Sequence, residues 1–255
     1  RAPARPGLSE ARPPLYKGAG GGETMRDWSW AAASRQTLPF FVSTCVTSGQ
    51  MTEIATLAAN SIACRRGGRL LFEGLSFSLN SGEALLVTGP NGAGKTSLLR
   101  LIAGLLPLEA GHFEGGDPSL PLAEQCHYIG HLNAVRNALS LRENARFWAE
   151  YLEGEGDGFE EGIALFGLED IADVPAGILS AGQKRKAALL RLFAASRPIW
   201  LLDEPSVSLD AASVKILAGV VKRHLVGGGI AIVASHTKLG VPFAQELKLA
   251  REPVS

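Results

Sequence analysis

Short apolar segments alternate with longer amphipathic ones along this chain, and the alternation begins only after residue 50. Three of the apolar segments, at 83–88, 199–202 and 230–234, have the length and composition of buried strands. The stretches between them carry the spacing and end signals of helices, which are predicted over 97–103, 140–153, 159–168, 180–196 and 212–225. Strands that alternate with helices predict an α/β fold with a parallel sheet covered on both faces.

Local signals place the boundaries of these elements. Ser140 and Glu143 have the spacing of a capping box at a helix start. Glycines between 154 and 158 end that helix, and Arg197-Pro198 ends the next one, because the residue before proline avoids the helical conformation. Small strands joined by a basic turn are predicted over 54–79, and loops with short strands over 104–122.

Residues 1–50 differ in composition from the rest of the chain. They begin with arginine, are rich in Arg, Pro, Gly and Ala, and show little periodicity. An excess of basic over acidic residues leaves a transit peptide open as one interpretation. The other is a non-native extension, with the protein itself opening at Met51. The composition predicts disorder over 1–50 and one domain over 51–255.

The bulk composition narrows the class of protein. The 255 residues carry a formal net charge of zero, so charge gives no reason to expect a nucleic-acid partner. The three cysteines show no Cys-x-x-Cys spacing, which argues against a zinc site or a disulfide framework. No apolar segment is long enough to cross a bilayer, so a role at a membrane would require docking on another protein.

The most informative motif is Gly89-Pro90-Asn91-Gly92-Ala93-Gly94-Lys95-Thr96, which follows an apolar strand and precedes a helix. Its spacing is that of a phosphate-binding loop, in which glycines let backbone N–H groups surround the phosphates of a nucleoside triphosphate. Lys95 would reach the β- and γ-phosphates, and the Thr96 hydroxyl would ligate Mg²⁺. Ser97 continues into a helix whose N-terminal dipole faces the anion. This segment predicts a nucleoside triphosphate and Mg²⁺ as ligands.

Two acidic residues follow the apolar segment 199–202. Asp203 stands at the end of the predicted strand, where Mg²⁺ needs an acidic partner beside Thr96. Glu204 is placed to polarise the water that attacks the γ-phosphate. Taken alone, the pair could be an acidic turn after a strand, but the phosphate-binding loop upstream favours the catalytic interpretation.

A second candidate anion site begins the helix predicted over 180–196. Ser180 is a natural N-cap, and Gly182 would let a phosphate approach the backbone closely. The start of a helix attracts anions through its free N–H groups. An ordinary capped helix explains the same residues. The anion-site interpretation is therefore favoured only in combination with the other motifs of the chain.

Together these residues resemble those of the ATP-binding-cassette (ABC) ATPases, over about 54–248. Ser180-Ala181-Gly182-Gln183 are similar to the family's signature motif, with Ala181 in place of a glycine. Asp203-Glu204 are similar to its Walker B pair, and Asp210 to the end of its D-loop. His236, just after the third apolar strand, is similar to the switch histidine that contacts the γ-phosphate.

The resemblance implies a P-loop NTPase fold of the RecA-like type. Its parallel-sheet core would carry an antiparallel β subdomain and an inserted small helical subdomain over about 132–180. The resemblance also implies a head-to-tail homodimer, with each ATP held between the phosphate-binding loop of one chain and the signature helix of the other.

The resemblance also assigns roles to the candidate residues. Glu204 would be the general base, His236 would orient the γ-phosphate, and Lys95 would neutralise charge in the transition state. The residues expected to bind ATP are Gly89, Pro90, Asn91, Gly92, Ala93, Gly94, Lys95, Thr96, Ser97, Ser180, Ala181, Gly182, Gln183 and Asp210. Those expected to hold Mg²⁺ are Thr96 and Asp203, with His131 as a further candidate.

Two positions depart from the family pattern. His131 stands where many members carry a glutamine, and a histidine there can still hydrogen-bond a metal-bound water. No aromatic residue occurs at 64–66, where many relatives stack a ring on adenine.

A narrower resemblance concerns three segments: Ile129-Gly130-His131, Leu179 to Gln183, and Trp200 to Pro205. They are similar to the ATPase subunits of the haem-export systems used in bacterial cytochrome c maturation, although Ser206-Val207 and Leu132-Asn133 differ. This resemblance implies a peripheral subunit on the cytoplasmic side of the cell inner membrane. It would dock on integral-membrane subunits of the CcmB and CcmC type through a cleft bordered by His131 and residues 132–150.

Two alternatives stay open from the sequence. The first is the ATPase of another small exporter, for drugs, lipids or lipoproteins, which would share every catalytic residue and differ in its membrane partner. The second is a soluble cassette protein that acts as an assembly factor, for example in iron–sulfur cluster formation. Such a factor would not need a membrane partner to stay folded or active.

Overall fold

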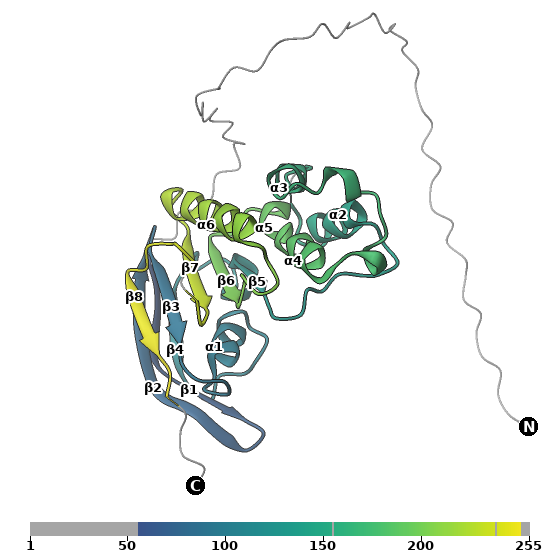
Figure 1. Ribbon diagram of the computed structural model, residues 1–255. Coiled ribbons are helices and arrows are strands. Elements are labelled where there is room, and N and C mark those ends of the chain that lie inside the picture. The colour runs from purple at the N-terminus through teal and green to yellow at the C-terminus, as the bar shows by residue number, and fades with distance from the viewer. Residues whose placement is uncertain (1–55, 155, 238, 251–255) are drawn as a thin grey trace, which may run out of the picture. The chain divides into compact units, whose positions relative to one another are not determined.

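The computed structural model of the chain describes residues 56–154, 156–237 and 239–250 (Figure 1). The predicted disorder of residues 1–50 lies outside these described residues.

A five-stranded parallel sheet forms the centre of the fold, in the order β5-β6-β7-β3-β8. Its strands are β3 (Ala84–Thr88), β5 (Cys126–Ile129), β6 (Ile199–Asp203), β7 (Ile230–Ala234) and β8 (Gln245–Lys248). The three strands predicted from apolar segments, β3, β6 and β7, are confirmed and lie next to one another. The sequence reasoning did not predict the two edge strands, β5 and β8.

A smaller antiparallel sheet has the order β2-β1-β4. It consists of β1 (Thr56–Arg66), β2 (Arg69–Asn80) and β4 (Ala110–Gly115). Two glycines at 67 and 68 turn the chain between β1 and β2 within the predicted basic turn. These two strands have 11 and 12 residues, so the expectation of small strands underestimated them.

The helices between β5 and β6 in the chain form a lobe (Figure 1). The lobe contains α2 (Leu141–Tyr151), α3 (Phe159–Leu165), α4 (Ala181–Leu189), α5 (Arg191–Ala194) and the short 3₁₀ helices Glu169–Ile171 and Ala176–Ile178. A third 3₁₀ helix, Leu122–Gln125, precedes β5. Ser140 and Glu143 form the predicted capping box at the start of α2. The helical subdomain bounds of about 132–180 stay a prediction, and α4 and α5 lie beyond them in the chain.

The single helix predicted over 180–196 is wrong, because the structure divides it at Leu190 into α4 and α5. The N–H group of Leu190 bonds to the carbonyl of Ala187, and that of Phe193 bonds to the carbonyl of Leu190. Hydrogen bonds three residues apart replace the four-residue spacing here, so the chain tightens and the first helix ends.

Side chains that alternate along the central strands divide the interior into two cores. Ile199 and Leu201 of β6 pack toward the antiparallel sheet and α1 (Lys95–Ile102). Trp200 and Leu202 of the same strand pack toward α6 (Ala211–Val226) and the helical lobe. Both faces of the parallel sheet are thus covered, as the sequence predicted.

Two histidines are buried against Trp200 in the second core. The ring of His224 stacks on the indole at 3.9 Å between centroids, and His127 meets its edge at 6.4 Å. His127 donates from Nε2 to the carbonyl of Ala195 at 2.8 Å. Burial lowers the pKa of His127 to about 3 and that of His224 to about 4. Both rings are therefore neutral in the folded protein at neutral pH.

We expect these histidines to make the fold sensitive to acid. An unfolded histidine binds a proton below about pH 6.5, whereas the folded rings do not, so the free energy of unfolding decreases as the pH falls from about 6.5 toward 4. Each ring should contribute about 2 kcal/mol of this loss by pH 5. Urea unfolding at pH 7.5 and pH 5.0 would measure it. His224→Phe keeps the stacked ring and removes one proton site, so an unchanged pH dependence in this variant would contradict the assignment.

Candidate nucleotide-binding site

The loop between β3 and α1 has the backbone of an anion cradle. Gly89, Gly92 and Gly94 adopt positive φ angles of 138°, 81° and 104°. A Cβ atom on Gly89 would lie 2.3 Å from the carbonyl oxygen of Leu249, so only glycine fits at that position. Gly94 is the N-cap of α1, so the first N–H groups of this helix point out of the loop toward a ligand.

The ammonium group of Lys95 lies along this loop. Its Nζ donates to the carbonyl oxygens of Gly89 at 2.7 Å and Pro90 at 3.4 Å. The same Nζ is 3.1 Å from Nε2 of His236, which follows β7. The loop itself and one distant segment, the one that carries His236, thus meet at this cation.

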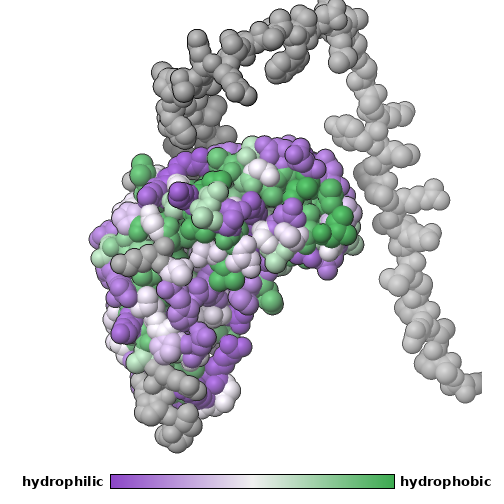
Figure 2. All heavy atoms as spheres, viewed as in Figure 1, coloured by the Kyte–Doolittle hydropathy of each residue, from purple (hydrophilic) through white to green (hydrophobic). Residues whose placement is uncertain are grey.

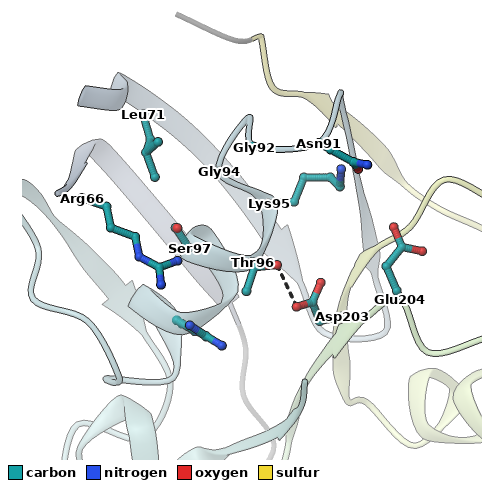
Figure 3. Close-up of a pocket in the computed structure, with 11 residues that line it drawn as sticks. Arg66, Leu71, Asn91, Gly92, Gly94, Lys95, Thr96, Ser97, Asp203 and Glu204 are labelled. Carbon is teal, nitrogen blue, oxygen red and sulfur yellow. Dashed lines mark hydrogen bonds between the residues drawn. The ribbon is translucent and has the colours of Figure 1, made fainter. Parts of the chain in front are cut away.

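Thr96 and Asp203 meet where α1 approaches the end of β6. The Thr96 hydroxyl donates to Oδ2 of Asp203 at 2.8 Å (Figure 3). A hydroxyl and a carboxylate are the hard oxygen ligands that Mg²⁺ prefers, and this ion takes its other ligands from water and phosphates. Among the described residues, no group of three or more His, Cys, Asp or Glu side chains could hold a metal ion.

Glu204 has an unusual backbone and an unpartnered carboxylate oxygen. Its φ angle of 46° lies in the left-handed region, which costs a non-glycine residue about 1–3 kcal/mol. Its Oε2 is 3.4 Å from the Ser235 hydroxyl and 3.5 Å from the N–H group of His236. Its Oε1 is buried without a hydrogen-bond partner, 3.6 Å from Nε2 of His236. The carboxylate is therefore held on one side only, and one oxygen is left to accept a proton or a water.

His236 joins these groups through a single nitrogen atom. Its Nε2 is 3.1 Å from Oδ1 of Asn91 as well as from Nζ of Lys95. The ring is half exposed, so a ligand above the loop can reach it. The structure thus brings together Lys95, Glu204 and His236, the three residues expected to be catalytic.

The phosphate-binding loop, Lys95, Thr96, Asp203 and Glu204 border a cavity of about 490 Å³. Figure 3 shows Asp203 and Glu204 on one side of the loop and Arg66 with Leu71 on the other. A triphosphate held by Lys95 and Thr96 would direct its base toward Arg66 and Leu71. Leu71 and the inward position of Arg66 were not among the predicted site residues, because nothing in the local sequence marks them.

His131 borders a neighbouring cavity of about 760 Å³ rather than the first one. Glu204, Asn91 and His236 line this second cavity too, so His131 faces the same catalytic group from the helical side. The imidazole of His131 is exposed.

The signature segment and Asp210 do not line either cavity. Ser180 and Gln183 form a capping box at the start of α4. A Cβ atom on Gly182 would lie 2.9 Å from the carbonyl oxygen of Ser208, so this glycine is required by packing within the chain. Asp210 caps α6 by accepting from the N–H group of Ser213 at 2.7 Å and lies 3.6 Å from Nζ of Lys186. The nucleotide roles of these residues stay predictions.

A family model for ABC transporters matches residues 72–207. The chain belongs to the ABC transporter family. It is 49% identical over 195 residues to the cytochrome c biogenesis ATP-binding export protein CcmA of Nitrobacter winogradskyi, covering 76% of this chain and 97% of that protein. It is 50% identical over 196 residues to the protein of the same name from Chelativorans sp., with the same coverage.

Solved structures support the fold. An ABC transporter ATP-binding protein from Pyrococcus furiosus superposes with a TM-score of 0.66 at 21% identity, covering 76% of this chain and 97% of that chain. The chain is thus an ABC transporter ATPase, and ATP is its ligand. In the described part of the chain, no helix has the length and apolarity needed to span a membrane.

We expect Arg66 to contact the nucleotide base. A guanidinium can stack on a planar ring, and such a contact contributes about 1 kcal/mol, so Arg66→Ala should raise the KM for ATP by about fivefold. The kcat should not change, because Arg66 lies away from Asp203 and Glu204. Steady-state ATPase kinetics would measure both constants. Arg65→Ala is the matched control, since Arg65 pairs with Glu109 outside the cavity. Equal effects of the two substitutions would contradict the assignment.

Proposed function

We propose that this protein is the ATP-hydrolysing subunit of a haem exporter that serves c-type cytochrome biogenesis. The observation that carries the proposal is 49% identity across 97% of a relative named as a cytochrome c biogenesis ATP-binding export protein. The convergence of Lys95, Glu204 and His236 supports the enzymatic part, since Nε2 of His236 lies 3.1 Å from Nζ of Lys95 and 3.6 Å from Oε1 of Glu204.

The residues of this site suit the hydrolysis of ATP. Lys95 would leave the carbonyls of Gly89 and Pro90 and bind the β- and γ-phosphates instead. Thr96 and Asp203 would hold Mg²⁺, which neutralises charge on the phosphates. Glu204 would accept the proton of the attacking water as its oxygen bonds to the γ-phosphorus and the bond to ADP breaks.

His236 would bind the γ-phosphate from the side of β7. Its Nε2 already lies beside the Lys95 ammonium, at the position where the terminal phosphate would accept from both groups. Loss of that phosphate after hydrolysis would remove the shared partner of Lys95 and His236. The site would thereby distinguish ATP from ADP.

The signature residues would act on the nucleotide of a second copy of the chain. Ser180 and Ala181 are exposed and line neither cavity of their own chain. The free N–H groups at the start of α4 can bind an anion presented by a partner molecule. A head-to-tail homodimer satisfies both observations, with ATP between the two chains.

Glu204→Gln should trap this dimer. The amide cannot accept the proton of the attacking water, so the variant should bind ATP and hydrolyse it at least about 100-fold more slowly than the wild type. Size-exclusion chromatography with ATP and Mg²⁺ should then show a dimer that dissociates when ADP replaces ATP. A variant that stays monomeric in ATP would contradict the homodimer, and near-normal turnover would contradict the role of Glu204.

We also propose that the helical lobe docks on integral-membrane subunits of the CcmB and CcmC type. Leu132, next to His131, and Tyr151 at the end of α2 are 77% and 68% exposed. Phe147 stacks on Tyr151 at 6.1 Å between centroids, and the guanidinium of Arg136 lies over the Phe147 ring, 5.0 Å from its centroid. Figure 2 shows hydrophobic residues gathered over the lobe. Such a patch fits a protein partner, and would place the chain at the cytoplasmic side of the inner membrane.

Covalent haem staining of c-type cytochromes tests the proposal. In a strain that lacks this gene, haem-stained bands should be lost, and the wild-type gene should restore them. Lys95→Ala should not restore them, because it removes the cation that binds the phosphates. Unchanged bands in the deletion strain would contradict the proposed cargo and favour another small exporter.

A second variant separates docking from catalysis in the same strain. Tyr151→Glu places a charge in the exposed aromatic patch, far from the cavity residues, so ATPase activity of the purified protein should persist while haem staining fails. Restoration of staining by Tyr151→Glu would contradict the docking surface. Activity without any membrane association in cell fractions would instead support a soluble assembly factor.

A further inference from the structure

Arg185 in the second turn of α4 is a buried cation whose hydrogen bonds are fully satisfied. The residue is only 3% exposed, and burial lowers its pKa, although the charges of Asp203 and Glu204 oppose that shift. A guanidinium has five N–H groups, and this one donates to five oxygen atoms. These acceptors are the carbonyls of Pro205 (3.2 Å), Gly130 (2.8 Å), Asp203 (3.0 Å) and Glu204 (2.8 Å), and Oδ1 of Asn133 (3.3 Å).

Three of these acceptors are the backbone carbonyls of consecutive residues, Asp203, Glu204 and Pro205. Arg185 therefore holds the backbone on both sides of the residue that adopts the left-handed φ angle of 46°. The N–H group of Glu204 is fixed separately, by the carbonyl of Ala234 at 2.8 Å. With both peptide groups anchored, the direction in which the Glu204 side chain leaves the backbone is set.

The other two acceptors belong to the loop that carries His131. Gly130 precedes that histidine and Asn133 follows it by two residues. Arg185 itself lies two residues after Gln183, within the helix that begins at the signature segment. One guanidinium thus connects the signature helix, the His131 loop and the turn of Glu204.

We propose that Arg185 is a positioning residue that holds the Glu204 carboxylate in its orientation for hydrolysis. The inference rests on the proposed role of Glu204 as general base. It extends that role, because movement of α4 or of the His131 loop would shift the carbonyls that Arg185 binds. A change in the position of the helical lobe would thereby alter the orientation of the Glu204 carboxylate through the Arg185 side chain.

The chain offers a matched control in Arg191 of α5. This arginine is also buried, at 7% exposed, and burial lowers its pKa to about 10. Its contacts are the carbonyl of Ala188 at 3.2 Å and the ring of Trp148 at 4.7 Å, and none of them reaches Glu204. Arg191→Lys therefore measures the general effect of replacing a buried arginine in this lobe.

Steady-state ATPase kinetics of the full-length protein provide the first test. Lysine has three donors on one atom and cannot reproduce a planar array of five, so Arg185→Lys should lower kcat by about 10- to 100-fold. The KM for ATP should stay within about twofold, because Arg185 makes no contact with the phosphate-binding loop. Arg191→Lys should keep kcat within about threefold. Equal losses of kcat in the two variants would overturn the proposal.

A double-mutant cycle with Glu204→Gln provides the second test and separates positioning from a structural role. If Arg185 acts through the Glu204 carboxylate, adding Arg185→Lys to Glu204→Gln should lower the residual turnover by less than about threefold. The same 10- to 100-fold loss in both backgrounds would overturn the proposal. Full turnover in Glu204→Gln alone would instead overturn the general base itself, so the two failures are distinguishable.

A milder variant covers the case in which Arg185→Lys does not fold. Asn133→Ala removes the only side-chain acceptor of Arg185 and leaves the guanidinium in place. It should lower kcat by about two- to fivefold with unchanged KM, and this loss should vanish in the Glu204→Gln background. A loss that persists in that background, or no loss at all, would overturn the proposal.

Discussion

Parallel pairing of β3, β6 and β7 is the constraint on which the site depends. Their register sets Val87 and Asp203 on either side of Ala234, so the chain segments that follow the three strands emerge together at one edge of the sheet. The hydrogen bond from Thr96 to Asp203 closes that edge between α1 and β6. In a parallel sheet every carboxyl end points the same way, and residues far apart in sequence therefore meet around a single ligand.

The same edge carries several energetically unfavourable features. Glu204 and Ser208 both have positive φ angles although neither is glycine. Oε1 of Glu204 is buried without a partner, and the Lys95 ammonium is satisfied by carbonyls that a phosphate would replace. Two well-packed cores compensate for these costs, so the strain persists where the chemistry requires unsatisfied groups.

The sequence predicted those parts of the structure that short-range physics determines. The phosphate-binding loop, the capping box at Ser140 and the three buried strands depend on residues within a few positions of one another. Edge strand β8 has the sequence Gln-Glu-Leu-Lys and is mostly exposed, so it has no apolar pattern that would predict a strand. Its extended conformation depends instead on its pairing with β3.

Arg185 shows the same limit within the site. It stands in the segment Gln-Lys-Arg-Lys, which has the composition of a solvated helix face. Four of its five acceptors are backbone carbonyls, so no side chain in the sequence marks them as partners. The break of the helix at Leu190 likewise follows from packing in the lobe. The topology of the chain brings such partners together, and the local sequence pattern does not predict these contacts.

Strand β6 connects the nucleotide site to the helical lobe. Ile199 and Leu201 belong to the core shared with α1 and the antiparallel sheet, whereas Trp200 and Leu202 belong to the core shared with the lobe. Asp203 ends this strand and Glu204 follows it directly. We therefore expect a displacement of the lobe to move this strand end relative to the phosphate-binding loop, because the loop packs with the other core. Since a packed interior resists continuous deformation, such a strand end would favour discrete positions.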